Sequence, residues 1–120
     1  MVRYRTMAEL KPYTLIDSWK TAYGISGYVT FGGYQSTLTS SDTLGLCRYT
    51  SHGCVLILHD KLRTHPVIAH AVLWHEFAHA AAFYEHDHQC QDHNGEWRKW
   101  LWKRPLLALI DTFAPSPSLL

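Results

Sequence analysis

The stretch WHEFAHAAAFYEHDHQCQDHNGEW, residues 74–97, decides how the rest of the chain is interpreted, because it joins a helical segment to a histidine-rich one. The helical period begins at Pro66, since proline is favoured in a first turn. It continues without an internal glycine or proline through Ala80–Ala82, a run of high helix propensity. We therefore predict a helix over residues 66–85 and a polar loop over residues 86–94.

The predicted helix contains the pattern His-Glu-x-x-His at residues 75–79. Four residues turn a helix by about 400°, so His75 and His79 lie on one face, about 6 Å apart, where both imidazoles can reach one metal ion. Glu76 lies about 100° round the helix, close enough to take a proton from a metal-bound water without being a ligand. Zinc suits this arrangement because it binds imidazole and lowers the pKa of a bound water toward about 7. The competing interpretation is that these are ordinary surface or core residues, since a chain with nine histidines also produces the pattern by chance.

A catalytic zinc needs a third protein ligand and an open fourth position. Two residues that follow His79 do not qualify on a straight helix: Glu85 points about 120° away, and His86 lies about 10 Å farther along the axis. His88 and Cys90 lie in the predicted loop and stay open as ligands.

The third ligand can also come from the chain after the loop. GEWRKWLWKR and PLLALIDTF predict two short helices that are joined or kinked at Pro105. A helix packed antiparallel to the first would return His93, at its start, to the metal. Glu96, one turn later, would do the same in a thermolysin-like arrangement.

Upstream of the motif the sequence predicts an α+β fold. Residues 6–23 have a helical apolar period, with Pro12 in the first turn or at a break. Short runs rich in β-branched and aromatic residues then predict a small antiparallel sheet of three to four strands: GYVTF, YQSTL, LGLCRYT and CVLILHD. CVLIL is apolar throughout, so it predicts a central strand, and we expect an edge strand within residues 43–50.

The whole chain, residues 1–120, is expected to form one domain with a tail at about residues 114–120. The HExxH helix should pack on the sheet, and the helix after it should carry the third ligand. Three cysteines without a CxxC pair argue against a disulfide framework, so we expect Cys47 and Cys54 to be free, partly buried thiols.

HEFAHA, followed by a short loop and HNGEWRKW, resembles the SprT/Spartan family of zinc metallopeptidases over about residues 10–104. Members of that family show HExxHA, a variable loop, and then a histidine with a glycine and an aromatic residue closely behind it. The resemblance implies that Glu76 is the catalytic glutamate and that Trp97 anchors the next helix. It implies one zinc ion per chain with three histidine ligands: His75, His79 and His93. The glycine follows His93 by two places here, and no zinc ribbon follows the motif, so we expect a minimal catalytic core.

The overall composition predicts no particular partner, so a partner would have to be recognised by a local feature of the surface. A formal charge of +1 excludes general attraction to nucleic acid or acidic lipid. Arg98, Lys99 and Lys103 lie among tryptophans, and they form either a solvated face or a contact with nucleic acid. The family resemblance favours DNA, because Spartan-type proteases act on DNA-bound proteins.

The N-terminal segment has no continuous apolar core, and the longest apolar runs are too short to cross a bilayer, so we expect a cytoplasmic monomer with no membrane partner. Together these observations predict a zinc-dependent metalloendopeptidase that cuts protein or peptide substrates. The alternative is a non-enzymatic, zinc-stabilised binding or adaptor protein, in which a fourth protein ligand closes the site.

Overall fold

The computed structural model describes residues 4–38, 43–86 and 95–112, with side chains from Lys11 onward. Its helices and strands, in chain order, are α1 (Tyr4–Tyr23), β1 (Val29–Gln35), β2 (Gly45–Thr50), β3 (Gly53–His59), the 3-10 helix η1 (Asp60–Thr64), α2 (Pro66–Glu85), α3 (Gly95–Leu101) and α4 (Pro105–Thr112). The α+β class is confirmed, and α2 has the predicted bounds. None of the described helices is both long enough and apolar enough to span a membrane.

The sheet has three strands in the order β1-β3-β2. The apolar strand β3 is central, as predicted, and β2 is an edge strand antiparallel to it. The predicted all-antiparallel sheet is wrong for β1, which pairs with β3 in parallel. The strand order explains this pairing. β3 lies between β1 and β2, and these two strands run in opposite directions, so a strand antiparallel to β2 is parallel to β1. Cys47 and Cys54 are free and buried, opposite Leu56 and Tyr49 respectively.

The two runs GYVTF and YQSTL contribute to one strand, although we expected the glycine pair between them to separate two. Register shifts by one residue between Phe31 and Tyr34, so β1 contains a bulge and then resumes pairing. Gly33, at φ 101°, adopts the backbone conformation that lets the chain absorb the extra residue. The sheet therefore has three strands in the described chain.

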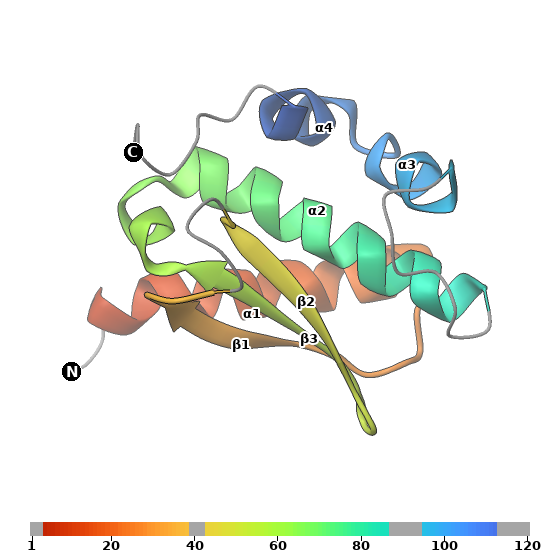
Figure 1. The fold of residues 1–120 in the computed structure, drawn as a ribbon, viewed down its shortest axis with the longest axis horizontal. Coiled ribbons are helices and arrows are strands. Elements are labelled where there is room, and N and C mark those ends of the chain that lie inside the picture. The colour runs from red at the N-terminus through yellow and green to blue at the C-terminus, as the bar shows by residue number, and fades with distance from the viewer. Residues whose placement is uncertain (1–3, 39–42, 87–94, 113–120) are drawn as a thin grey trace.

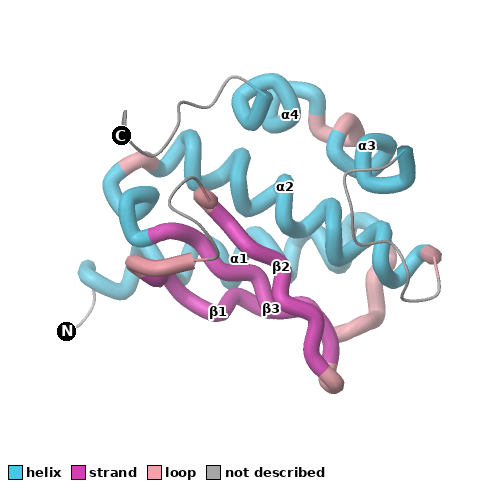
Figure 2. The backbone as a smooth tube through the Cα atoms, in the orientation of Figure 1, coloured by secondary structure: helices cyan, strands magenta, loops and turns pink. Residues whose placement is uncertain are grey.

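Helix α2 occupies the middle of the molecule, between α3 and α4 on one side and the sheet on the other (Figures 1 and 2). It is buried over most of its length because its residues are apolar on nearly every face, which is typical of a central helix. Trp19 of α1 packs edge-on against Trp74 and tilted against Phe77, with ring centroids 5.0 and 5.3 Å apart. These aromatic contacts join α1 and α2 in one core.

Helix α1 continues through Pro12, which we expected to mark a first turn or a break. Proline removes one helical hydrogen bond. The helix persists because the residues beyond it, Ile16 and Trp19, are almost fully buried.

Tryptophan side chains fix α3 on α2. Trp74 Nε1 donates to the Leu101 carbonyl at 2.8 Å, and Trp97 Nε1 donates to the His75 carbonyl at 3.2 Å. Trp100 Nε1 donates to Glu85 Oε1 at 2.8 Å. The predicted break at Pro105 separates α3 from α4.

Candidate metal centre

Three side chains of α2 gather as the HExxH pattern predicts. His75, Glu76 and His79 each offer one ligand atom, and these atoms all lie within 4.8 Å of one another. The two imidazole centroids are 5.2 Å apart, and His75 Nε2 lies 3.9 Å from Glu76 Oε2. The helix therefore places two imidazoles and one carboxylate around a space that fits a single ion.

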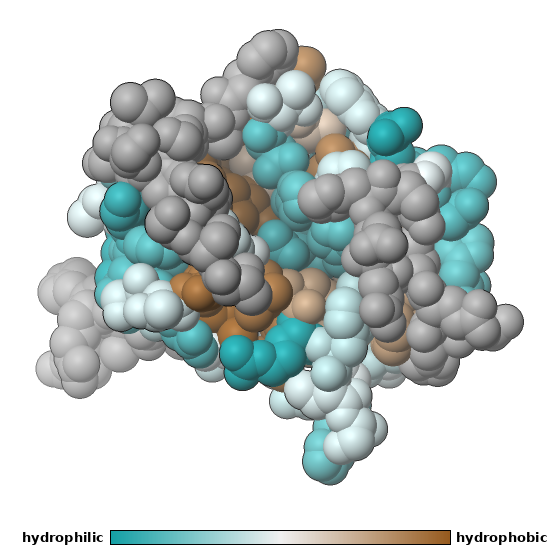
Figure 3. Space-filling model, in the orientation of Figure 1, coloured by the Kyte–Doolittle hydropathy of each residue, from teal (hydrophilic) through white to brown (hydrophobic). Residues whose placement is uncertain are grey.

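The group is largely shielded from solvent. Glu76 and His79 are each 7% exposed, while the His75 side chain is 18% exposed. Hydrophilic surface gathers over the middle of the face shown in Figure 3, with hydrophobic surface beside it. Of the three side chains, that of His75 is therefore the most accessible to solvent.

Asp111 of α4, which the sequence analysis missed, completes the environment of His75. Asp111 Oδ2 lies 2.7 Å from His75 Nδ1, and the two side chains are 16% and 18% exposed. Because a carboxylate only accepts, this contact assigns the ring hydrogen to Nδ1 and the lone pair of the neutral ring to Nε2, the atom that a metal would bind. The available signal was a lone aspartate directly after the apolar segment PLLALI, but nothing in its spacing relates it to the motif 36 residues earlier.

Burial and neighbouring charges shift the pKa values of this group. Burial raises the pKa of Glu76 to about 7, opposed by His75 and helped by Asp111. Burial by itself lowers the pKa of His75, but the hydrogen bond with Asp111 and the charges of Glu76 and Asp111 outweigh it, so the net pKa is raised. A carboxyl group with a pKa near neutrality is suited to exchanging protons.

Trp97 of α3 covers the two histidines. Its ring centroid lies 4.9 Å from that of His75, and it stacks on His79 at 5.3 Å with an interplanar angle of 20°. Trp97, which is only 8% exposed, therefore anchors α3 on α2 through these contacts, as expected from the sequence. The start of α3 lies directly against the histidine pair.

Comparison with known proteins identifies the family. A family model for the SprT-like family matches residues 30–104, which is more than half of the chain. The chain belongs to the SprT-like family. No curated protein and no solved structure matches it. The matched region of this SprT-like chain runs from β1 through α3, so Asp111 and the whole of α1 lie outside it.

The alternative ligands within the described SprT-like chain are engaged elsewhere. Glu85 accepts from Trp100, as noted above, and His86 Nε2 lies 3.3 Å from Glu85 Oε1 and 3.4 Å from Glu96 Oε2. Glu96 also lies 3.6 Å from Lys99 Nζ. None of the three belongs to the group around His75, so the thermolysin-like use of Glu96 finds no support in this arrangement.

The remaining ligand predictions, His88, Cys90 and His93, lie outside the described residues. The basic residues after them are exposed: Arg98, Lys99 and Lys103. Lys103 Nζ lies 4.9 Å from the Trp100 ring centroid.

The donor set fits zinc. Imidazole nitrogen and carboxylate oxygen are both zinc ligands, and the hydrogen bond from His75 to a carboxylate is the usual support of a zinc-bound histidine. His75 and His79 would hold the ion.

Proposed function

We propose that this SprT-like chain is a zinc-dependent metalloendopeptidase, hydrolysing peptide bonds of protein substrates. The observation that carries the proposal is the grouping of His75, Glu76 and His79 on one face of α2, with His75 oriented by Asp111. A buried carboxyl with a pKa near neutrality beside two imidazoles is more than a structural zinc site requires.

His75, His79 and His93 are proposed as the zinc ligands, with a fourth position open. Support for His93 comes from its place in the sequence, two residues before α3 begins at Gly95, because Trp97 of α3 already lies against His75 and His79. When bound, zinc supplies a Lewis acid that polarises a peptide carbonyl and makes water more acidic.

Glu76 is proposed as the general base. Its carboxylate accepts a proton from the attacking water as the new C–O bond forms. The same carboxyl then returns the proton to the departing nitrogen as the C–N bond breaks, so that the base is regenerated. Burial assists both transfers, because a carboxyl with a pKa of about 7 can both accept and release a proton near neutral pH.

Strand β2 is proposed as the place where an extended substrate adds to the sheet. His59 N donates to the Leu44 carbonyl, so in this antiparallel pair the residues at even positions bond to β3. The main-chain groups of Gly45, Cys47 and Tyr49 consequently face the free edge. The edge lies close to the base, since a Cβ added at Gly45 would be 3.0 Å from Glu76 Oε2. A peptide strand there would pass beside the metal group.

DNA is proposed as a second partner, contacted through Arg98, Lys99 and Lys103. The exposure of these residues, and of Trp102 at 44%, supports this use. We further propose that the protein acts as a monomer in the cytoplasm.

The test compares the wild type with Glu76→Gln, which keeps the size of the side chain but cannot accept a proton. Both proteins should bind one zinc ion, measured by elemental analysis, and show the same circular dichroism. Hydrolysis of casein, with and without single-stranded DNA, should fall about 10²-fold or more in Glu76→Gln. If both proteins cut equally, or neither cuts, the peptidase proposal is wrong.

If the peptidase proposal is wrong, the alternative is a non-enzymatic, zinc-stabilised binding or adaptor protein. It also predicts a different zinc site, closed by four protein ligands without an open position. X-ray absorption on the zinc-loaded protein separates the two, because an open site shows a light oxygen or nitrogen scatterer that azide or a hydroxamate displaces.

A further inference from the structure

A cavity lies away from the candidate metal centre and shares no residue with it. Its volume is about 310 Å³, and α1, β1, β3, η1 and the first turns of α2 line it. His70 lines the cavity and stacks on Trp19 of α1, whereas His75, five residues later, faces Asp111 of α4. Five residues turn a helix by about 140°, so the two sites lie on different faces of α2.

The walls of the cavity are mainly apolar. They are formed by side chains that are buried or half-buried: Pro12, Leu15, Leu58, Leu62, Ala69 and Leu73. The volume is at the lower end of the range of about 300–1,000 Å³ that small-molecule sites occupy. The space therefore suits a short hydrocarbon body rather than a folded segment or a large cofactor.

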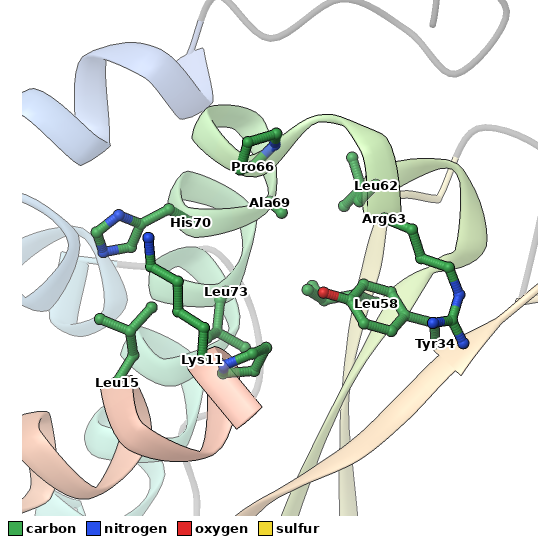
Figure 4. Close-up of a pocket in the computed structure, with 11 residues that line it drawn as sticks. Lys11, Leu15, Tyr34, Leu58, Leu62, Arg63, Pro66, Ala69, His70 and Leu73 are labelled. Atoms are coloured by element: carbon green, nitrogen blue, oxygen red, sulfur yellow. The ribbon is translucent and has the colours of Figure 1, made fainter. Parts of the chain in front are cut away.

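The polar groups at the cavity are basic, and among the described residues that line it none is acidic. Figure 4 shows the Lys11 side chain beside the imidazole of His70, on the side opposite Tyr34 and Arg63. Burial lowers the pKa of His70, and the positive charges of Lys11 and Arg104 lower it further. An anion at this end would relieve that repulsion.

Of the two cationic side chains among the described residues that line the cavity, Lys11 and Arg63, Lys11 remains available for a ligand, because Arg63 is already paired. Arg63 Nε lies 2.9 Å from Asp60 Oδ1, and its guanidinium lies 4.5 Å from the centre of the Tyr34 ring. One exposed ammonium with one imidazole matches a single negative charge better than a dianionic phosphate.

We propose that this cavity binds a small amphipathic carboxylate, with its hydrocarbon body among the leucines and its head group between Lys11 and His70. The site is independent of the proposed peptidase activity. Its α1 wall lies outside the matched region of the family model.

The test is isothermal titration of the metal-free Glu76→Gln protein, so that the result does not depend on zinc or hydrolysis. Octanoate should bind once per chain, and octanol, which has the same body without charge, about tenfold more weakly. Octyl phosphate is included to distinguish the head groups, and it should bind no more tightly than octanoate. Amide shifts in the NMR spectrum should change in η1 and the first turns of α2.

Substitutions at and away from the cavity test which side chains contribute to ligand binding. Lys11→Met should weaken octanoate about tenfold and leave octanol unchanged. Lys20→Met, on the same helix but away from the cavity, should change neither. Ala69→Phe should fill the cavity and remove binding of both, with melting temperature confirming the fold. The proposal is overturned if the folded wild type does not bind octanoate, or binds octanoate and octanol equally. It is also overturned if octyl phosphate binds more tightly than octanoate, or if Lys11→Met binds octanoate as the wild type does.

Discussion

His75 Nδ1 and Asp111 Oδ2 lie 2.7 Å apart, although 36 residues separate them in the sequence. This contact connects the HExxH helix to α4, which lies outside the matched region of the SprT-like family model. It directs Nε2 of His75 toward the metal group, and it places a negative charge behind the ligand. Orientation and charge both increase the affinity of an imidazole for a metal ion.

We therefore expect Asp111→Asn to weaken zinc binding by about 10- to 100-fold while leaving the fold intact. Competition with a chromophoric chelator measures the affinity directly, without an activity assay. Asp111→Glu should recover part of it, because the charge is restored at a longer reach. Thr112→Val is the matched control on α4, since the Thr112 hydroxyl donates to the Ala108 carbonyl within its own helix. Zinc affinity that is equal in Asp111→Asn and wild type would show that the contact does not support the ligand.

The identity of the third zinc ligand is tested by a pair of alanine variants. His93→Ala should lose tightly bound zinc, because only two protein imidazoles would remain. Glu96→Ala should retain one zinc ion per chain, since Glu96 lies with His86 and Lys99 instead of with the metal group. Elemental analysis after dialysis against a weak chelator makes the measurement. Retention by His93→Ala together with loss by Glu96→Ala would reverse the assignment.

The sequence predicted the grouping of His75, Glu76 and His79 because this grouping depends only on local helix geometry. A spacing of four residues on a helix determines that His75 and His79 share a face, whatever the rest of the fold does. The bounds of α2 followed for the same reason, from a proline start and an uninterrupted helical segment. The edge position of β2 followed from the contrast between its mixed polar and apolar residues and the apolar run CVLIL of β3.

What the sequence did not predict depends on contacts between distant segments. Asp111 meets His75 only because α4 packs back across α2, and nothing in the local pattern of α4 specifies that docking. The parallel pairing of β1 depends likewise on the position of β3 between β1 and β2, which joins segments that are distant in the sequence. Gly33 looked like a strand end because glycine commonly is one, whereas here it forms a bulge.

The proposed substrate edge predicts an unusual effect of proline. Cys47→Pro removes a main-chain N–H that faces the free edge of β2, and proline is tolerated on edge strands in that orientation. Cleavage of an extended peptide should fall about tenfold, because one hydrogen bond to the substrate is lost. Cys47→Ala keeps the N–H and should retain most activity. Zinc content is measured in parallel, since simultaneous loss of zinc and cleavage indicates unfolding of the strand rather than a defect in substrate binding.

The last prediction concerns the metal-free protein and pH. Glu76 has its pKa raised from 4.5 to about 7, so in the folded state it holds a proton that the unfolded chain has already released near neutrality. The pKa of His75 is also raised, which acts in the same direction. Folding stability should therefore decrease as pH rises through about 6 to 8, by roughly 1 kcal/mol from Glu76 alone.

Urea unfolding of the chelator-treated protein measures this slope. Glu76→Gln cannot titrate at this position, so its stability should change less over the same interval, and the difference between the two curves isolates the carboxyl group. Zinc should reverse the trend in the wild type, because its ligands bind metal only when deprotonated and the affinity rises with pH. Parallel curves for metal-free wild type and Glu76→Gln would mean that burial does not raise the pKa of this carboxyl, and the assignment of Glu76 as a base poised near neutral pH would lose its physical support.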